Sequence, residues 1–109
     1  MPSDAEWLEL TTYLGGTSLA GGKLKEESTN YWYSPNTGAT NETGFTALPG
    51  GNRDSGGTFN SLRNYGYWWS TTEYLPNTAW PRMMNFNNSS VYKNNYIKST
   101  GFSVRCVRD

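Results

Sequence analysis

Residues 65–74 read YGYWWSTTEY, and their alternation is the strongest strand signal in the chain. A strand here would place Tyr67, Trp69 and Thr71 on one face and the residues between them on the other. Aromatic and β-branched side chains dominate the stretch, and these side chains suit a pleated, half-buried surface. The stretch therefore predicts a strand over residues 65–74.

Downstream, AWPRMMNF (79–86) and SVYKNNYI (90–97) predict two more strands, joined as a hairpin through residues 87–89. Pro81 has no amide proton to donate to a neighbouring strand, so the first of them is expected to be an edge or irregular strand. The last stretch, GFSVRCVRD (101–109), predicts a final strand with Phe102, Val104 and Cys106 on one face.

Upstream, a helix is predicted from about Asp4 to Leu14. Ser3 and Glu6 form a capping box at its start, and Gly15 and Gly16 supply its stop. Helical spacing places Trp7, Leu10 and Leu14 on one face of this helix, and we expect that face to pack against the interior.

Between the predicted helix and the predicted strand at residues 65–74, the sequence pattern is weak. AGGKLKE (20–26) alternates enough to predict a short strand, and residues 31–59 form a long segment rich in Gly, Asn, Thr and Pro. Such a segment needs internal anchors if it is to be ordered. The candidate anchors are Trp32, Phe45, Leu48 and Phe59. The order of elements predicts a single α+β domain over residues 1–109, with one N-terminal helix, antiparallel strands and long irregular loops.

Composition narrows the functions. Nine basic residues balance nine acidic ones, which gives no electrostatic reason to expect nucleic acid as a partner. No run approaches the about 20 apolar residues of a membrane span, so membrane insertion is not expected, and the N-terminus does not read as a signal peptide. Cys106 is the only cysteine, so it cannot form a disulfide within the chain. Three alternatives stay open: a buried inert thiol, a disulfide to another chain, or a disulfide to a cysteine in a missing segment. Composition favours the buried thiol.

Catalytic residues are scarce, and we expect no enzyme activity. The chain has no histidine, and its scattered carboxylates form no recognisable pair: Glu26, Glu27, Glu42, Asp54 and Glu73. Zinc lacks ligands, and no cofactor is expected. Structural calcium stays open as an alternative at NRDSGG (52–57), which has the right residue types without the spacing of an EF-hand loop.

Residues 74–96 are the candidate binding region. Rings supply rigid contact area, and asparagine and serine supply adaptable hydrogen bonds, a combination typical of recognition surfaces. The candidate site residues are Tyr74, Asn77, Trp80, Arg82, Met84, Asn85, Asn87, Asn88, Tyr92, Asn94 and Tyr96. On the strand 79–86, Trp80, Arg82 and Met84 share one face, and Met83 and Asn85 share the other. Spacing alone does not say which face is buried, so a core role for each ring stays open.

Several stretches together resemble a known family: PSDAEW (2–7), NTGATNETGFTALPGG (36–51), GYWWSTTEY (66–74) and GFSVRCVRD. In this order they are similar to the Fibrobacter succinogenes major paralogous domain, a bacterial family related to the formylglycine-generating-enzyme type of C-type-lectin fold. The resemblance implies a C-type-lectin-like fold in an extracytoplasmic protein, secreted or at the cell surface, encoded by a bacterium or phage. The catalytic cysteines of the related enzymes do not carry over, because the single cysteine lies in the terminal motif.

One departure from the family pattern has consequences. Family members carry a segment resembling C-P-x-G-W before the PSDAEW helix, with a cysteine placed to pair with the one in GFSVRCV. The resemblance therefore implies that the first strand is missing, that Cys106 is an orphaned disulfide cysteine, and that an uncovered sheet edge permits self-association.

The same fold is used by diversity-generating retroelements, whose variable residues lie just before a fixed terminal strand. The Tyr- and Asn-rich residues 74–96, followed by GFSVRCV, are similar to that arrangement. The leading hypothesis is a non-enzymatic module that recognises a protein or glycan through residues 74–96, with this variable region as one form of it. The alternative is a structural or adhesive cell-envelope domain without a dedicated ligand.

Overall fold

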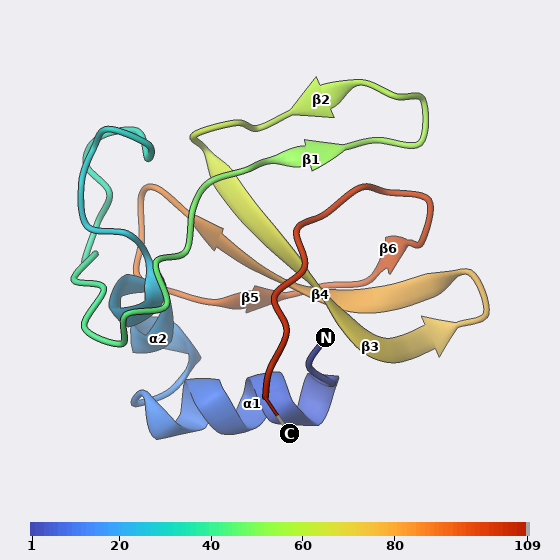
Figure 1. The fold of residues 1–109 in the computed structure, drawn as a ribbon, viewed down its shortest axis with the longest axis horizontal. Coiled ribbons are helices and arrows are strands. Elements are labelled where there is room, and N and C mark those ends of the chain that lie inside the picture. Colours follow the sequence, from blue (N-terminus) through green and yellow to red (C-terminus); the bar gives the residue numbers. More distant parts are fainter. Residues whose placement is uncertain (109) are drawn as a thin grey trace.

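The computed structural model describes residues 1–108 and shows an α+β domain (Figure 1). Two helices come first, and short and long strands follow. The helices are α1 (Asp4–Tyr13) and α2 (Thr17–Leu24), and the strands are β1 (Asn52–Arg53), β2 (Phe59–Asn60), β3 (Tyr65–Leu75), β4 (Thr78–Asn85), β5 (Tyr92–Lys93) and β6 (Tyr96–Ile97). Within residues 1–108 no helix is long and apolar enough to cross a membrane.

The main sheet is built on the strand predicted at residues 65–74. β3 pairs with β4 antiparallel, and the far edge of β4 pairs with β5 and with β6. The strand predicted at residues 79–86 and its hairpin are confirmed, whereas the strand predicted at residues 90–97 forms only as the two-residue strands β5 and β6. β4 is paired on both sides, so the edge-strand form of the prediction is wrong, whereas the irregular form is confirmed by the register shifts in its pairing with β3. Pro81 is tolerated because it lies between the residues that pair with β6, ending at Ala79, and those that pair with β5, starting at Arg82.

Helix α1 forms as predicted, with both hydrogen bonds of the Ser3–Glu6 capping box and Trp7 buried. The short strand predicted at residues 20–26 is wrong, because most of that stretch belongs to α2. Ala20 and Leu24, one helical turn apart, are both fully buried. The buried face of α2 can be recognised only in the packed structure. The weak alternation of residue types in this stretch therefore led to the wrong prediction of a strand.

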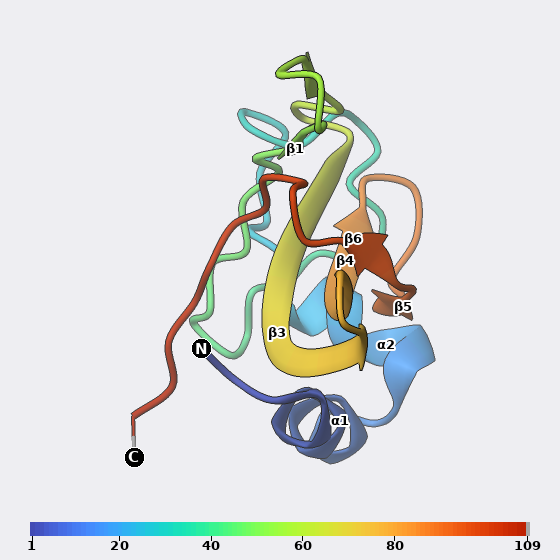
Figure 2. The ribbon, with the colours of Figure 1, turned by 90° about the vertical axis from the view of Figure 1, so that its right-hand side faces the viewer.

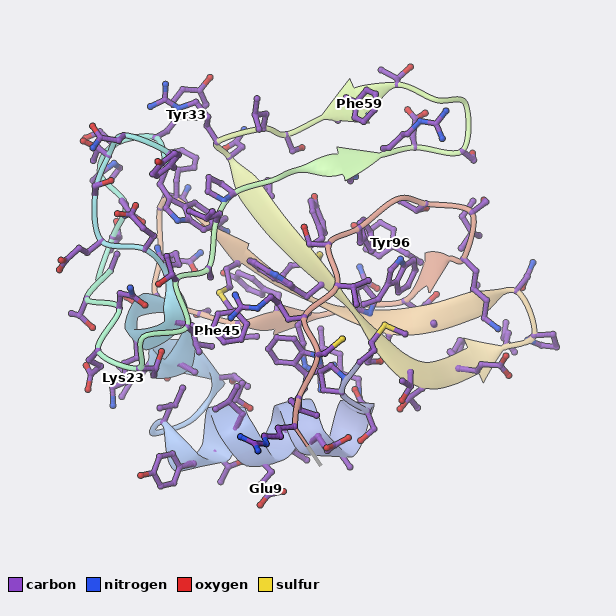
Figure 3. The ribbon with its side chains drawn as sticks, viewed as in Figure 1. Glu9, Lys23, Tyr33, Phe45, Phe59 and Tyr96 are labelled. Carbon is purple, nitrogen blue, oxygen red and sulfur yellow. The ribbon has the colours of Figure 1, made fainter. Side chains whose placement is uncertain are left out.

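The long segment before β3 has fewer anchors than predicted. Trp32 is fully buried and its indole nitrogen donates to the Ala47 carbonyl at 3.0 Å. Phe45 is half-buried against the core. Leu48 and Phe59 are exposed, so their assignment as anchors is wrong; Figure 3 shows Phe59 on the hairpin that carries β2, away from the helices.

The predicted terminal strand does not form. The segment 101–108 makes single bridges at Gly101 and at Ser103 and then runs past β3 toward α1 (Figure 2). Val104 and Cys106 are exposed, so the expectation of a buried thiol is wrong. A strand needs a partner along its length, and beyond Ser103 no pairing to β3 continues within the described residues.

The core lies between the helices and one face of the main sheet, and its largest side chains are rings. Trp7 from α1, Trp32 from the long segment and Trp68 from β3 meet Leu24 and Met84 there. A chain in which aromatic residues make up 16% of the sequence thus fills its interior mainly with large rings.

Candidate functional site: a tyrosine-lined pocket on the sheet

The register of β3 and β4 sorts their side chains onto two faces, because directly opposed residues of an antiparallel pair share a face. Trp68 opposes Arg82 on the inner face, which looks toward α1 and the core. Tyr67 opposes Met83 on the other face, which we call the outer face. The two faces have different chemistry.

The inner face is structural. Arg82 is 4% exposed, and the Nη1 of its guanidinium lies 2.6 Å from Oδ1 of Asp4 on α1. Met84 is fully buried in the core. Trp80 is half-buried beneath the Lys93 ammonium, 4.6 Å from the ring centre, and packs edge-on against Tyr74. This placement removes Arg82 and Met84 from the surface that a ligand can reach.

The outer face is hollowed into a pocket of about 440 Å³. It is open to solvent, and its walls come from β3, β4, β5, β6 and the connection between the last two. The lining residues are Tyr65, Tyr67, Met83, Asn85, Tyr92, Lys93, Asn94 and Tyr96. The volume is within the range of sites that hold a small ligand or one unit of a larger one.

The tyrosine rings that line the pocket pack against one another and against the terminal segment. The rings of Tyr65 and Tyr67 stack with their centres 5.6 Å apart, and Tyr96 stands edge-on to Tyr67 at 6.2 Å. Phe102 of the terminal segment stacks on Tyr67 at 4.7 Å and meets Tyr96 edge-on at 5.3 Å. Figure 3 places Tyr96 beside the terminal segment that carries this ring. The terminal motif therefore contributes to the site by holding the tyrosines in fixed orientations.

The polar groups of the pocket are mostly neutral. The Asn88 side chain donates from Nδ2 to the Tyr92 hydroxyl at 2.7 Å. Burial raises the pKa of the Tyr67 phenol, and neighbouring Tyr96 raises it further, so this phenol stays protonated at neutral pH. The one charged lining residue, Lys93, directs its ammonium away, to Oδ2 of Asp4 at 2.8 Å. The pocket thus presents phenols and amides.

The structure separates the candidate site residues into groups. Asn85, Tyr92, Asn94 and Tyr96 line the pocket, and Asn88 supports Tyr92. The remaining surface candidates lie outside the pocket lining: Tyr74, Asn77, Trp80 and Asn87.

Sequence reasoning missed part of the pocket. Tyr65, Tyr67 and Lys93 were not assigned to a site, and Met83 was left on an undecided face. The alternation of YGYWW already puts Tyr65 and Tyr67 on one face, but their alignment with Met83 requires the register of the sheet.

Metal sites find little support in the described part of the chain. Residues 1–108 contain no group of three histidine, cysteine or acidic residues that could hold a metal ion. In the loop considered for calcium, the Asp54 carboxylate accepts from the backbone amides of Gly56 and Thr58 at 3.0 Å each. These hydrogen bonds occupy the carboxylate in shaping its own turn, and the pKa of Asp54 is lowered, chiefly by the one from Thr58.

The fold and the pocket define a small α+β domain with one core-facing and one open, tyrosine-lined sheet face. The chain belongs to the Fibrobacter succinogenes major domain family, whose model matches residues 1–108. This match confirms the family named from the sequence motifs. Comparisons with curated proteins and with solved structures gave no significant match.

Proposed function

We propose that this domain is a non-enzymatic recognition module and that the outer-face pocket is its ligand site. The observation that carries the proposal is the union of stacked tyrosines with amide side chains in one open concavity. Tyrosine gives large, rigid contact area at low entropic cost, and asparagine gives hydrogen bonds that adapt to a partner. The expected ligand is a protein or a glycan.

The chemistry of the pocket favours a neutral group on that ligand. With the Lys93 ammonium committed to Asp4, ionic attraction has no strong source among the lining side chains. A sugar ring or a neutral polar loop can meet tyrosine faces and exchange hydrogen bonds with Asn85 and Asn94. The site is thus suited to shape and hydrogen bonding, and we expect its affinity to depend weakly on salt.

The wider biological setting is part of the same proposal. Family membership supports an extracytoplasmic, bacterial or phage-encoded protein with a C-type-lectin-like fold related to that of formylglycine-generating enzymes. The proposal includes genetic diversification of residues 74–96, whose Tyr- and Asn-rich composition before the terminal motif resembles the variable regions of diversity-generating retroelements; several of these residues line the pocket. The genomic test is a near-identical template repeat beside a reverse-transcriptase gene, with differences confined to adenines. A locus lacking both would remove the diversification part alone.

The functional test is an array of glycans and of extracellular proteins probed with wild type, Tyr96→Ala and Tyr74→Ala. Both tyrosines lie in the candidate region, but only Tyr96 lines the pocket, whereas Tyr74 is 54% exposed outside the pocket lining. We expect a saturable signal that Tyr96→Ala reduces at least tenfold and Tyr74→Ala preserves, with both variants folded by circular dichroism. A saturable signal that both variants preserve would refute the pocket as the site.

A second function, adhesion without a dedicated ligand, is favoured by one separate observation. Phe59 and Leu62 are large apolar side chains, yet they are 79% and 69% exposed. Such surface suits weak contact with neighbouring envelope components. In the array, this function predicts a low, non-saturable signal. The signal should be weaker for Phe59→Ser and unchanged for Tyr96→Ala.

A further inference from the structure

Lys25 ends helix α2 with its side chain in the interior of the domain. The residue is fully buried, and its ammonium nitrogen lies 2.9 Å from each of three backbone carbonyls. These belong to Thr37, Asn85 and Asn88. An ammonium has three N–H bonds, so every donor of Lys25 is used. The Trp32 ring covers the same nitrogen from 5.4 Å.

Among the described residues, the charge of Lys25 is balanced by carbonyl dipoles and not by an acid. Three other charged groups make their contacts elsewhere. The Glu26 carboxylate accepts from the Ser28 hydroxyl at 2.8 Å, the Lys93 ammonium pairs with α1, and Lys23 lies on the side of α2 near Gly15. Burial lowers the pKa of Lys25 to about 8.

The rest of α2 is fitted to the same stretch of chain, residues 85–91, which we call the Asn-rich segment. A Cβ on Gly21 would lie 2.4 Å from the Ser90 carbonyl oxygen, so only glycine allows the two backbones to approach this closely. The amide of Gly22 donates to the Ser89 carbonyl at 3.1 Å, and the amide of Val91 donates to the Thr17 carbonyl at 2.8 Å. The Asn-rich segment therefore rests on α2 along its length.

Two short paths lead from Lys25 to the pocket. Lys25 holds the carbonyl of Asn88, whose side chain donates to the Tyr92 hydroxyl at 2.7 Å. Lys25 also holds the carbonyl of Asn85, whose side chain lines the pocket. A change at Lys25 is thus transmitted to one wall of the pocket through two backbone positions.

We propose that Lys25 is a positioning residue: its ammonium acts as a built-in structural cation that fixes the Asn-rich segment and, through Asn88, the Tyr92 wall of the pocket. The inference rests on the proposed function only in taking that wall to be the one that meets a ligand. When the amine is neutral it can donate two hydrogen bonds instead of three, so one carbonyl loses its partner. The wall then shifts while the fold persists.

The test follows the Tyr92 ring by NMR in protein labelled with ¹³C-tyrosine, with the signal assigned through Tyr92→Phe, from pH 6.5 to 9.5. We expect its Cζ shift to change with a midpoint near pH 8, below the ordinary range of a phenol. Lys25→Met should abolish this step. Lys23→Met, which removes a lysine from the same helix, should keep it.

A flat Tyr92 signal in the wild type, or a step that survives in Lys25→Met, would overturn the inference. Should Lys25→Met fail to fold, the ¹⁵Nζ resonance of Lys25 in the wild type decides: the inference requires it to titrate with the Tyr92 midpoint, and different midpoints reject it. No ligand enters this experiment, so a failed binding array would remove the proposed function without touching the result.

Discussion

Gly21 is the residue at which helix α2 touches the Asn-rich segment, and replacing it sets two effects against each other. Alanine gains about 1 kcal/mol of helix propensity over glycine. Its Cβ, however, would lie 2.4 Å from the Ser90 carbonyl oxygen, a backbone atom that cannot rotate away. Overpacking of this kind costs about 1–3 kcal/mol. We therefore expect Gly21→Ala to lower the free energy of unfolding in urea.

The matched control for that variant is Gly56→Ala. There the nearest atom to the new Cβ is Asp54 Oδ1 at 3.4 Å, an ordinary contact with a side chain. We expect the free energy of unfolding of Gly56→Ala to stay within about 0.5 kcal/mol of the wild-type value, the usual range of surface substitutions. A Gly21→Ala protein as stable as the control would show that α2 and the Asn-rich segment do not approach as described.

Lys25 should also give stability a measurable pH dependence. Its pKa of about 8 in the folded chain lies below the 10.5 of an ordinary lysine, so with rising pH the folded state loses the proton first. Between these values the unfolded chain binds more protons, and stability rises with pH. We expect the urea midpoint of wild type to increase from pH 8 to pH 9.5.

The comparison that isolates this effect is the same series on Lys25→Met, which should lack the increase although it is less stable at every pH. The pH series stops below pH 10 because of Tyr67, whose pKa is raised in the folded state. Above that pH, this group makes stability fall as pH rises, which is opposite to the effect of Lys25. Parallel midpoint curves for the two proteins would assign the pH dependence to other groups.

At the scale of elements, Asp4 joins the start of α1 to the sheet. Its Oδ1 lies 2.6 Å from Arg82 on β4, its Oδ2 lies 2.8 Å from Lys93 on β5, and its amide donates to Thr72 Oγ1 at 2.9 Å. Arg82 is 4% exposed, so the charge of its guanidinium depends on this partner. Removing one member of such a pair costs about 3–5 kcal/mol, more than an exposed ion pair contributes.

We predict that Asp4→Ala destabilises the domain by that order, whereas Glu9→Ala does not. Glu9 is an exposed acid on the same helix, and Figure 3 shows it pointing away from the sheet. Partial burial pushes the pKa of Asp4 up, but hydrogen bonds and charge from Lys93 and Arg82 outweigh it and hold the pKa below 3.8. The stabilisation is therefore present above that pH and is lost as pH falls through the folded-state value. Urea titrations at pH 7 and pH 3 measure both effects, and equal losses for the two variants would contradict the account.

The elements also show which features could be predicted from sequence. Helix α1 and strand β3 carry their signals locally, in a capping box and in strict alternation. Helix α2 was missed because Gly21 and Gly22 lower helix propensity, and their benefit, close approach to the Asn-rich segment, appears only in the packed structure. The terminal stretch alternates like a strand, but pairing depends on a partner that local sequence does not reveal.

The candidate site was predictable only in part, for a related reason. Composition pointed to residues 74–96, and Tyr92, Asn94 and Tyr96 do line the pocket. Which face of β4 is open depends on tertiary contacts. Arg82 lies on the inner face, where it forms an ion pair with Asp4 of α1. Met83 lies on the open face, where it opposes Tyr67 of β3. The register that decides this is a tertiary property.

At the scale of the whole molecule, Cys106 and the terminal segment bear on association. The thiol is exposed, which favours oxidation between chains. We expect a monomer in reducing buffer by light scattering, a disulfide-linked dimer after mild oxidation, and a monomer for Cys106→Ser under both conditions. A Cys106→Ser protein that still dimerises would instead support self-association through an uncovered sheet edge, as the family resemblance implies.

The central claim, that the outer-face pocket is the ligand site, is tested most directly by mapping a ligand onto the domain. The measurement is a titration of ¹⁵N- and ¹³C-tyrosine-labelled protein with the strongest saturable hit from the array. The account predicts that the shifts concentrate on the pocket, at Tyr67, Met83, Tyr92, Asn94 and Tyr96, and that Tyr74 does not move. Saturable shifts centred on α1, or on the exposed Phe59 end, with the pocket signals unchanged, would contradict it.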